Sequence, residues 1–387
     1  MTKDIIVIGG GASGLMCALT CALKGKKVTI LEGGLKVGKK ILVSGNGRCN
    51  LTNKNITNQN YNQFCELLNK FDTEKTLQLF ESLGLQTYFD DEGRCYPLSN
   101  HSASVLDVIL NKLNQTKCEI LVNTKVESIE KTNTGYLLTT NQGEFEAKKV
   151  VVATGGNTMQ NALVDLGLEF KPFKPSLCGL KTLQDTKLIS GVRTDCEIKV
   201  VNKDFVQFEK GEVIFKDEGI SGICIFNLSA KLNWAKLDSC SLSLNLLPNL
   251  KYNQLVELLQ QRKNNLLGLT VKQFFDGMLH KNLGLEILNR CHMNLQTPIA
   301  KLTLSNLKNF ATHLQNLTFN VCGFENNNQV YNGGVCLTEL NENLESKKHK
   351  NLYFCGEVVN VDGECGGYNL QWAWTSGHVV GDSLWLN

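Results

Sequence analysis

Three glycines near the N-terminus constrain the fold of this chain more than any other feature. The stretch GGGASG places Gly9, Gly11 and Gly14 in the spacing G-x-G-x-x-G. The apolar run DIIVI before it suits a buried parallel strand, and residues 13–27 after it carry apolar side chains at helical spacing. Between a strand and a helix, the first glycine permits a tight turn and the second lets a pyrophosphate approach the backbone. The third lets the helix pack on the strand.

An acidic residue follows at the place that this motif requires. The run KVTILE (27–32) is typical of a second strand, and it ends in Glu32, 18 residues after Gly14. A carboxylate there accepts hydrogen bonds from the ribose hydroxyls of a dinucleotide. The N–H groups at the helix start and the positive end of its dipole hold the phosphates. The sequence therefore predicts a dinucleotide site, and an ordinary glycine turn is the weaker alternative.

The remaining pattern indicates an α/β sheet with an insertion. Residues 126–156 alternate like a hairpin or meander and end in a buried strand, which favours a doubly wound sheet. Residues 180–247 form short alternating segments that suggest an antiparallel barrel, and residues 251–293 have helical periodicity. Strand character returns at 317–324, and a glycine-rich stretch, 351–377, closes the chain.

Composition excludes several classes of protein. The net charge of +3 over 387 residues is too mild to argue for nucleic acid, so we expect no nucleic-acid partner. No apolar segment reaches the roughly 20 residues that span a bilayer, and no cleavable signal precedes the first strand. The fifteen cysteines include no C-x-x-C pair and no zinc spacing, so we expect reduced thiols, no metal and a cytoplasmic protein. The oligomeric state is left open.

The first loop alone does not decide between NAD and FAD, because both dinucleotides use this fingerprint. A long second lobe followed by a glycine-rich C-terminal stretch favours FAD. A second pyrophosphate loop is also missing, because residues 150–158 follow a strand but lack the x-x-G spacing.

A second glycine loop follows the second strand. In the run SGNGRCN, Gly45 and Gly47 bracket Asn46 and precede Arg48. A backbone so free of side chains suits the close approach of a flat ring system. Lys39, Lys40 and Arg48 would supply positive charge near a flavin or a substrate anion. A solvated surface loop is the alternative interpretation.

These motifs together resemble one family. The runs DIIVIGGGASGLMCA, GKKILVSGNGRCNLTN, VVVATGG, GEVIFKDEGISG and GEVVNVDGECGGYNLQWAWTSG occur in this order and cover essentially the whole chain. They resemble the BaiN-like, aminoacetone-oxidase-like flavoproteins of the two-dinucleotide-binding-domain superfamily. The resemblance implies a Rossmann-type FAD domain built from residues 1–178 and 321–387. It also implies an inserted domain, 179–320, which is barrel-like at 179–250 and 300–320 and helical at 251–299.

The resemblance also implies roles for single residues. The ADP half would lie at the first loop and Glu32, the adenine at the backbone of Val126, and the isoalloxazine beside residues 367–371. The candidate FAD-binding residues, with those of both glycine loops included, lie in glycine turns or at the ends of expected strands. They are Gly9, Gly10, Gly11, Ala12, Gly14, Glu32, Lys40, Gly45, Gly47, Arg48, Val126, Thr154, Gly155, Gly356, Glu357, Gly367, Asn369, Leu370 and Gln371.

The implied activity is that of an FAD-dependent oxidoreductase. A hydride would pass between flavin N5 and a small organic substrate, either an amine or an enone-type carbon, with oxygen or NAD(P)H as the electron partner. The chain departs from the family pattern at Asn46, at residues 216–218 and at residues 223–224, so no substrate preference carries over. Tyr368 is a weak catalytic candidate, and packing on the helix start is equally compatible with its position.

Two alternatives remain. A fumarate-reductase-like or steroid-dehydrogenase-like flavoenzyme should have a capping domain rich in Arg and His, and the helical insert is poor in such clusters. A flavin-binding RNA-modification or interaction protein should have a basic stripe, whereas the lysines are dispersed along the sequence.

Overall fold

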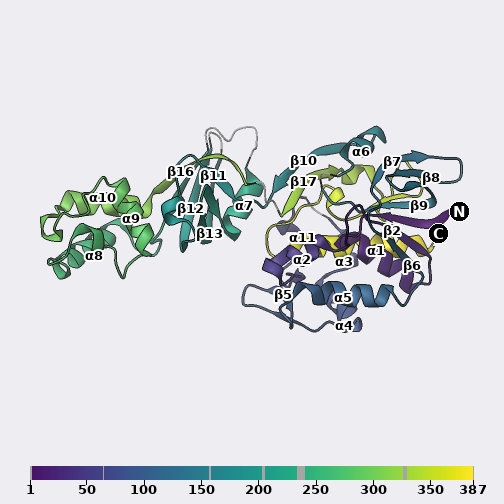
Figure 1. The fold of residues 1–387 in the computed structure, drawn as a ribbon, viewed down its shortest axis with the longest axis horizontal. Coiled ribbons are helices and arrows are strands. Elements are labelled where there is room, and N and C mark those ends of the chain that lie inside the picture. Colours follow the sequence, from purple (N-terminus) through teal and green to yellow (C-terminus); the bar gives the residue numbers. More distant parts are fainter. Residues whose placement is uncertain are drawn as a thin grey trace. The chain divides into compact units, whose positions relative to one another are not determined.

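The computed structural model describes residues 2–63, 65–156, 158–202, 205–232, 240–325 and 329–386. The chain divides into two compact units, Met1–Pro175 with Gln329–Asn387, and Ser176–Asn328 (Figure 1). Each unit has its own hydrophobic core. Within the described part of the chain, no helix is long and apolar enough to cross a membrane.

The first unit is built on a mixed sheet that both ends of the chain supply. Its path runs β6-β2-β1-β9-β8-β7, and β18 also pairs with β9. The pairs β1–β2, β1–β9, β2–β6 and β18–β9 are parallel, so these five strands end at one edge of the sheet. The strands are β1 (Lys3–Ile8), β2 (Val28–Leu31), β6 (Cys118–Leu121), β7 (Val126–Lys131), β8 (Tyr136–Thr140), β9 (Gly143–Val152) and β18 (Leu352–Phe354).

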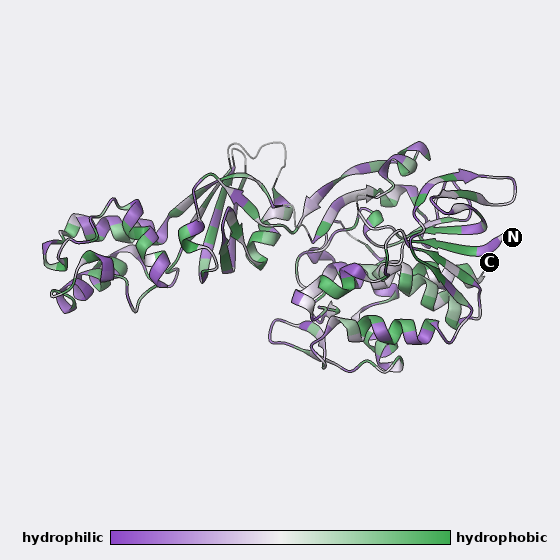
Figure 2. Cartoon of the chain, viewed as in Figure 1, coloured by the Kyte–Doolittle hydropathy of each residue, from purple (hydrophilic) through white to green (hydrophobic). Residues whose placement is uncertain are grey.

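Helices and small sheets complete this unit. In Figure 2 the parallel strands at the centre of the main sheet are largely hydrophobic, as expected for strands covered on both faces. The helices are α1 (Ala12–Leu23), α2 (Lys39–Val43), α3 (Leu67–Lys70), α4 (Thr73–Ser82), α5 (Ser102–Leu113), α6 (Gln160–Asp165) and α11 (Tyr368–Leu386). The smaller sheets contain β3 (Thr52–Asn53), β4 (Thr87–Phe89) and β5 (Arg94–Pro97), and the pair β10 (Phe170–Ser176) and β17 (Val330–Val335).

Glycines let the C-terminal helix α11 pack closely on α1. A Cβ atom at Gly377 would lie 2.4 Å from Ser13 O, and one at Gly381 would lie 2.7 Å from Cys17 O. The indole N–H groups of α11 then fix its start, because Trp372 donates to Gly356 O (3.0 Å) and Trp374 donates to Leu51 O (3.0 Å). Both tryptophans are buried. The aromatic and glycine content of the chain end is therefore explained largely by packing.

The second unit contains a closed antiparallel barrel and a helical subdomain. The barrel order is β11-β14-β13-β12-β15-β16, and alternate side chains of β12 point into its core. Its elements are β11 (Leu180–Thr182), β12 (Arg193–Asn202), β13 (Phe205–Lys216), β14 (Gly219–Ser221), α7 (Ile223–Lys231), β15 (Ser241–Asn245) and β16 (Leu317–Phe324). The helical subdomain contains α8 (Tyr252–Asn265), α9 (Lys281–Arg290) and α10 (Leu304–Gln315). The expected α/β fold with an inserted barrel and helices is confirmed.

Two expected boundaries need correction. Residues 300–320 were expected to be barrel-like, but most of them form α10. Thr303 caps this helix by accepting a hydrogen bond from the Asn306 N–H, and Leu307, Phe310 and Leu314 face the core at helical spacing. The expected boundary between residues 320 and 321 falls inside β16, which pairs with β11 and β15.

Candidate active site

Of the three motif glycines in the first loop, the fold itself requires two and does not require the third. Gly9 has φ +104°, and a Cβ atom there would lie 2.5 Å from Ala153 O. A Cβ atom at Gly14 would lie 2.0 Å from Gly9 O. At Gly11, by contrast, a Cβ atom would meet nothing within 4 Å. The protein leaves space in front of this residue, which is where the motif brings a pyrophosphate.

The start of α1 presents donors next to that space. Gly11 is the N-cap residue, and the first helical hydrogen bond runs from the Leu15 N–H to Gly11 O (2.9 Å). The N–H groups of Ala12, Ser13 and Gly14 therefore precede the helical ladder. No acidic side chain occupies this first turn. The positive end of the helix dipole is thus available to an anion.

Glu32 stands at the end of β2, beside the first loop. Its carboxylate accepts hydrogen bonds from the N–H groups of Gly10 (2.8 Å) and Gly34 (2.7 Å). These bonds fix the side chain and leave further acceptor sites on its two oxygens for ribose hydroxyls. The Thr124 N–H donates to Glu32 O (2.9 Å), so the segment that leads into Val126 lies against the end of β2.

Residues from four distant segments meet through Glu357. Its carboxylate accepts hydrogen bonds from Lys40 Nζ (2.5 Å), the Gly156 N–H (3.1 Å) and the Tyr331 N–H (2.5 Å). A Cβ atom at Gly155 would lie 3.2 Å from the same carboxylate. The expected residues Lys40, Gly155 and Glu357 are therefore brought together beyond the carboxyl ends of β9 and β18.

Two further residues of the expected set lie at this edge. Gly356 has φ +76°, and a Cβ atom there would lie 2.2 Å from Ser13 Oγ, so its glycine is needed for packing against α1. Thr154 follows β9, and its Cα would lie 3.0 Å from a Cβ atom at Gly9. Its hydroxyl is buried without a hydrogen-bond partner among the described residues. An unsatisfied hydroxyl beside the first loop fits a ligand that accepts a hydrogen bond there.

The second glycine loop has three consecutive residues in the left-handed region. Gly45, Asn46 and Gly47 have φ +55°, +56° and +80°. In the family that this chain resembles, glycine is usual at the position of Asn46. Asparagine tolerates the left-handed conformation better than most other residues with a side chain. A Cβ atom at Gly47 would meet nothing within 4 Å, and the guanidinium of Arg48 lies 4.4 Å from the ring centroid of Tyr96.

The C-terminal glycine turn (residues 363–367) packs against β3, the strand that follows the second loop. Gly367 has φ +100°, and a Cβ atom there would lie 2.7 Å from the backbone carbonyl of Thr52. Asn53 Nδ2 donates to Gly366 O (3.0 Å). The first hydrogen bond of α11 runs from the Gln371 N–H to Gly367 O (3.0 Å). The helix start, with the N–H groups of residues 368–370, is therefore held beside the second loop.

The side chains of Asn369 and Gln371 are occupied by the protein. The Asn369 amide accepts from the Gly363 N–H (2.8 Å) and donates to Gly363 O (2.8 Å). The Gln371 amide accepts from Thr52 Oγ1 (2.7 Å) and donates to Thr76 Oγ1 (2.8 Å). Leu370 is half-buried and packs against the core. A ligand at this turn would therefore contact backbone groups, above all the N–H groups at the start of α11.

Tyr368 is a packing residue in this structure. Its ring meets the ring of Tyr61 edge-on, with centroids 6.3 Å apart, and Tyr61 Oη donates to Tyr368 O (2.9 Å). A Cβ atom at Gly366 would lie 2.8 Å from the Tyr368 ring. Burial raises the pKa of Tyr368, so its hydroxyl stays protonated at neutral pH.

The sequence did not single out Asp362 as a catalytic candidate. This carboxyl group is buried, accepts from Asn62 Nδ2 (2.8 Å) and is also bonded by the backbone of Gly333. Burial, together with the charge of Glu357, raises the pKa of Asp362 to about 8. It lies in the segment between Glu357 and the C-terminal glycine turn, and it holds its proton at neutral pH. The only signal in the sequence was an acid beside glycines, which is common in turns.

The described part of the chain holds no cluster of three His, Cys, Asp or Glu side chains suited to a metal ion. Its cysteines are free thiols, and most of them are buried. Desolvation raises the pKa of Cys49 to about 12, so this thiol beside the second loop is protonated. The structure therefore offers acids that keep their protons rather than a reactive thiolate.

Known proteins match this chain over its whole length. The model of the HI0933-like protein Rossmann domain family matches residues 3–383. A 3-dehydro-bile acid delta(4,6)-reductase from Clostridium scindens is 31% identical, with 97% of each chain covered. Ribosomal RNA dihydrouridine synthases from Haemophilus influenzae and Escherichia coli are each 27% identical. They cover 99% and 98% of this chain and 98% of their own length.

Proposed function

Because the chain belongs to the HI0933-like Rossmann domain family and is an FAD-dependent oxidoreductase, we propose that it reduces a carbon–carbon double bond conjugated to a carbonyl group. The names of the relatives support this reaction. A 3-dehydro-delta(4,6) compound is a conjugated dienone, and dihydrouridine differs from uridine by saturation of the double bond next to a carbonyl. Reduction of a double bond next to a carbonyl adds a hydride to the β-carbon and a proton to the α-carbon. Amine oxidation has no counterpart in these three names.

The first glycine loop would hold the pyrophosphate of FAD. The open space at Gly11, the N–H groups at the start of α1 and the unpartnered hydroxyl of Thr154 fit an anion there. Glu32 would accept from the ribose hydroxyls, and Val126 would contact the adenine through its backbone. Lys40 and Glu357, which form an ion pair in this structure, would lie beside the phosphates and the ribityl chain.

The isoalloxazine would lie between the second loop and the C-terminal glycine turn. When bound, FAD supplies the hydride. The N–H groups of residues 368–370 at the start of α11 would stabilise negative charge on the ring edge, by roughly 0.3–2 kcal/mol for one helix dipole. Because every turnover consumes two electrons, NADH or NADPH would serve as the external reductant.

Asp362 is the proposed proton donor. Its carboxyl group is protonated at neutral pH and stands in the segment that joins Glu357 to the C-terminal glycine turn. A general acid should have a pKa near the working pH, because it must both hold and release its proton. Tyr368 is the less suitable donor, because its pKa is raised above the ordinary tyrosine value.

The observation that carries this proposal is the open space at Gly11 in a chain that is 31% identical over 97% of its length to an enone-type reductase. The test mixes the flavin-loaded protein anaerobically with NADH or NADPH, and then with a dienone steroid or a uracil-containing RNA. A separate sample of the oxidised protein is mixed with aminoacetone alone. We expect the reduced nucleotide to bleach the flavin and a conjugated substrate to restore its colour. Bleaching of the oxidised flavin by aminoacetone would instead identify an amine oxidase.

A further inference from the structure

A short segment, residues 60–63, runs antiparallel to the segment that carries Asp362, although the two lie 300 positions apart in the chain. Tyr61 and Gly363 form an antiparallel bridge, and backbone hydrogen bonds of 2.9 Å lie on both sides of it. Because Gly363 begins the C-terminal glycine turn, this bridge fixes the backbone of Asp362 at the point where the chain enters that turn.

Within this pairing, Asn62 makes three hydrogen bonds to Asp362 alone. The Asn62 N–H donates to Asp362 O (2.9 Å). The side-chain oxygen Oδ1 of Asn62 accepts from the Asp362 N–H (3.0 Å), and Nδ2 donates to Asp362 Oδ2 (2.8 Å). One asparagine side chain therefore holds both the main chain and the carboxyl group of the acid.

The backbone contact decides which way the Asn62 amide faces. A main-chain N–H can only donate, so the atom opposite the Asp362 N–H is the amide oxygen, and the amide nitrogen faces the carboxyl group. Burial, together with the charge of Glu357, raises the pKa of Asp362 to about 8, so this carboxyl group is neutral at neutral pH. Its proton is placed on Oδ1, because Oδ2 already accepts from the amide.

The charged groups near Asp362 do not give it a counter-ion. Glu357 repels a negative charge there, whereas the Gly333 N–H and the positive charge of Lys171 favour it. Among the described residues, no ion pair reaches the Asp362 carboxyl group. A neutral amide, that of Asn62, therefore takes the place that a cation takes beside most buried acids.

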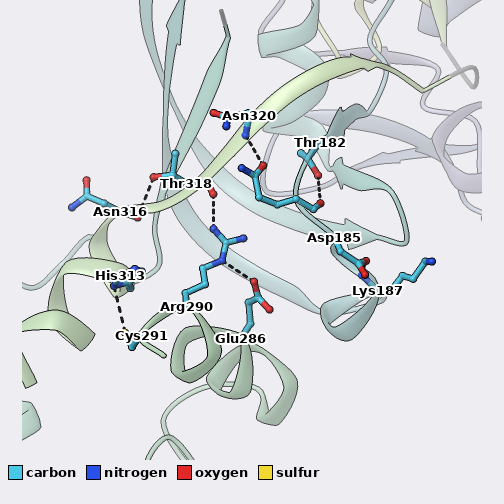
Figure 3. A network of polar contacts seen from close by, with 11 residues as sticks. Thr182, Asp185, Lys187, Glu286, Arg290, Cys291, His313, Asn316, Thr318 and Asn320 are labelled. Carbon is cyan, nitrogen blue, oxygen red and sulfur yellow. Dashed lines mark hydrogen bonds and ion pairs between the residues drawn. The ribbon is translucent and has the colours of Figure 1, made fainter. Parts of the chain in front are cut away.

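A half-buried acid of the second unit shows the arrangement that a purely structural role requires. Glu286 accepts from Arg290 Nε (2.7 Å), and Arg290 Nη1 also donates to Thr318 O (2.6 Å), so this pair ties α9 to β16 (Figure 3). The two charges neutralise each other, and no proton is left to transfer. Asp362, with an amide partner instead of a cation, keeps its proton.

We infer that Asn62 is a positioning residue for the proton transfer: it fixes the Asp362 carboxyl group and keeps the transferable proton on Oδ1. This inference rests on the proposed function, in which Asp362 protonates the α-carbon of the substrate. In that step the Oδ1–H bond breaks and a C–H bond forms at the α-carbon, while the β-carbon receives the hydride. Asp362 is left as a carboxylate that still accepts from Asn62 Nδ2, and it takes up a proton from water before the next turnover.

The first test variant is Asn62→Leu, which keeps the size of the side chain and removes the amide donor. Asn62 is exposed whereas Asp362 is buried, so this replacement does not open the core. The lost N–H bond favours the ionised carboxyl group, so its removal should raise the pH at which substrate reduction falls, by about one pH unit. At neutral pH, reduction should be about 10-fold slower, because the carboxyl group is no longer held in place.

The second variant, Asn62→Asp, keeps the shape of the side chain but places another carboxyl group against Asp362 Oδ2. Two carboxyl groups in hydrogen-bond contact share one proton, so the loss of that proton should move to a still higher pH than in Asn62→Leu. Because the shared proton lies between the two groups, reduction should be slower than in Asn62→Leu at neutral pH.

The matched control is Gln63→Leu, which removes the neighbouring side-chain amide. Gln63 Nε2 donates to Asn360 O, so it bonds the backbone of the same segment rather than the carboxyl group of Asp362. We expect the pH dependence of reduction to stay as in the wild type. If Asn62→Leu slowed reduction without moving the pH dependence, its role would be structural and the inference would be overturned.

A measurement without substrate separates this inference from the proposed function. Infrared spectra of the flavin-loaded, full-length protein with isotope-labelled aspartate follow the carboxyl C=O band of Asp362, which its loss in Asp362→Asn identifies. This band should disappear with a midpoint at about pH 8 in the wild type and about one pH unit higher in Asn62→Leu.

The two failures then look different. A midpoint that moves in Asn62→Leu, in a protein that reduces no conjugated substrate, would retain the pairing of Asn62 with the Asp362 proton and reject the reaction. Reduction of a conjugated substrate, with the same midpoint in the wild type and in Asn62→Leu, would retain the reaction and reject Asn62 as its positioning residue.

Discussion

The first glycine loop and the C-terminal glycine turn look alike in sequence but serve different purposes. At Gly11 a side chain would enter open space, so the fold does not require glycine there. At Gly363, Gly366 and Gly367 a Cβ atom would come within 2.6–2.8 Å of protein atoms. The first loop leaves room for a ligand at Gly11, whereas the C-terminal turn uses its glycines to pack against Thr52 and against the Tyr368 side chain at the start of α11. A glycine-rich run therefore indicates a ligand only where the missing side chain has no protein neighbour.

The strongest test of this comparison is Gly11→Val. The residue has φ −79° and ψ −172°, an extended conformation that valine adopts readily, so the apoprotein should lose about 1 kcal/mol at most through a weaker helix cap. FAD binding should be abolished, because the side chain fills the space left for the pyrophosphate. Urea unfolding of the apoprotein and FAD titration measure the two effects. The control is Gly14→Val, which should prevent folding, since its Cβ would lie 2.0 Å from Gly9 O.

A second test asks whether the C-terminal segment contributes chemistry through Asp362 rather than through its glycines. Wild-type substrate reduction should be fast below about pH 8 and fall above it, because the raised pKa keeps the donor protonated only below that value. Asp362→Asn should slow this step by about 100-fold or more and remove the inflection. Flavin reduction by NADPH should be unchanged. A variant that keeps the wild-type inflection would assign the proton to another group.

The local parts of the site could be predicted from the sequence, and the parts built from distant segments could not. The spacing of Gly9, Gly11 and Gly14 and the acid at Glu32 follow from one contiguous unit. The contact of Asp362 with Asn62, and that of Gln371 with Thr52, join residues about 300 positions apart. No periodicity encodes such pairs.

Gly367→Ala tests the second region of the comparison, the C-terminal glycine turn. Alanine at φ +100°, with its Cβ 2.7 Å from the Thr52 carbonyl, should destabilise the apoprotein by about 2–3 kcal/mol in urea unfolding. The matched control is Gly47→Ala, which has φ +80° but no atom within 4 Å of the new Cβ. It should lose only about 1–2 kcal/mol, the backbone cost of the left-handed region. Equal losses would mean that the close contact with Thr52 does not constrain the turn.

The smallest effect is expected at Asn46, which lies between Gly45 and Gly47 in the second loop. Its φ of +56° is one that asparagine tolerates, so Asn46→Gly relieves little strain and also adds freedom to the unfolded chain. The two effects oppose each other, and stability should change by no more than about 0.5 kcal/mol. FAD affinity should stay the same if the backbone, not the side chain, faces the ring.

Asn46→Val is the contrasting variant, because a β-branched residue cannot easily adopt this conformation and should destabilise the loop. If Asn46→Gly weakened FAD binding tenfold, the Asn46 side chain would itself be a ligand contact, and the second loop would differ from the first in using a side chain where the first uses space.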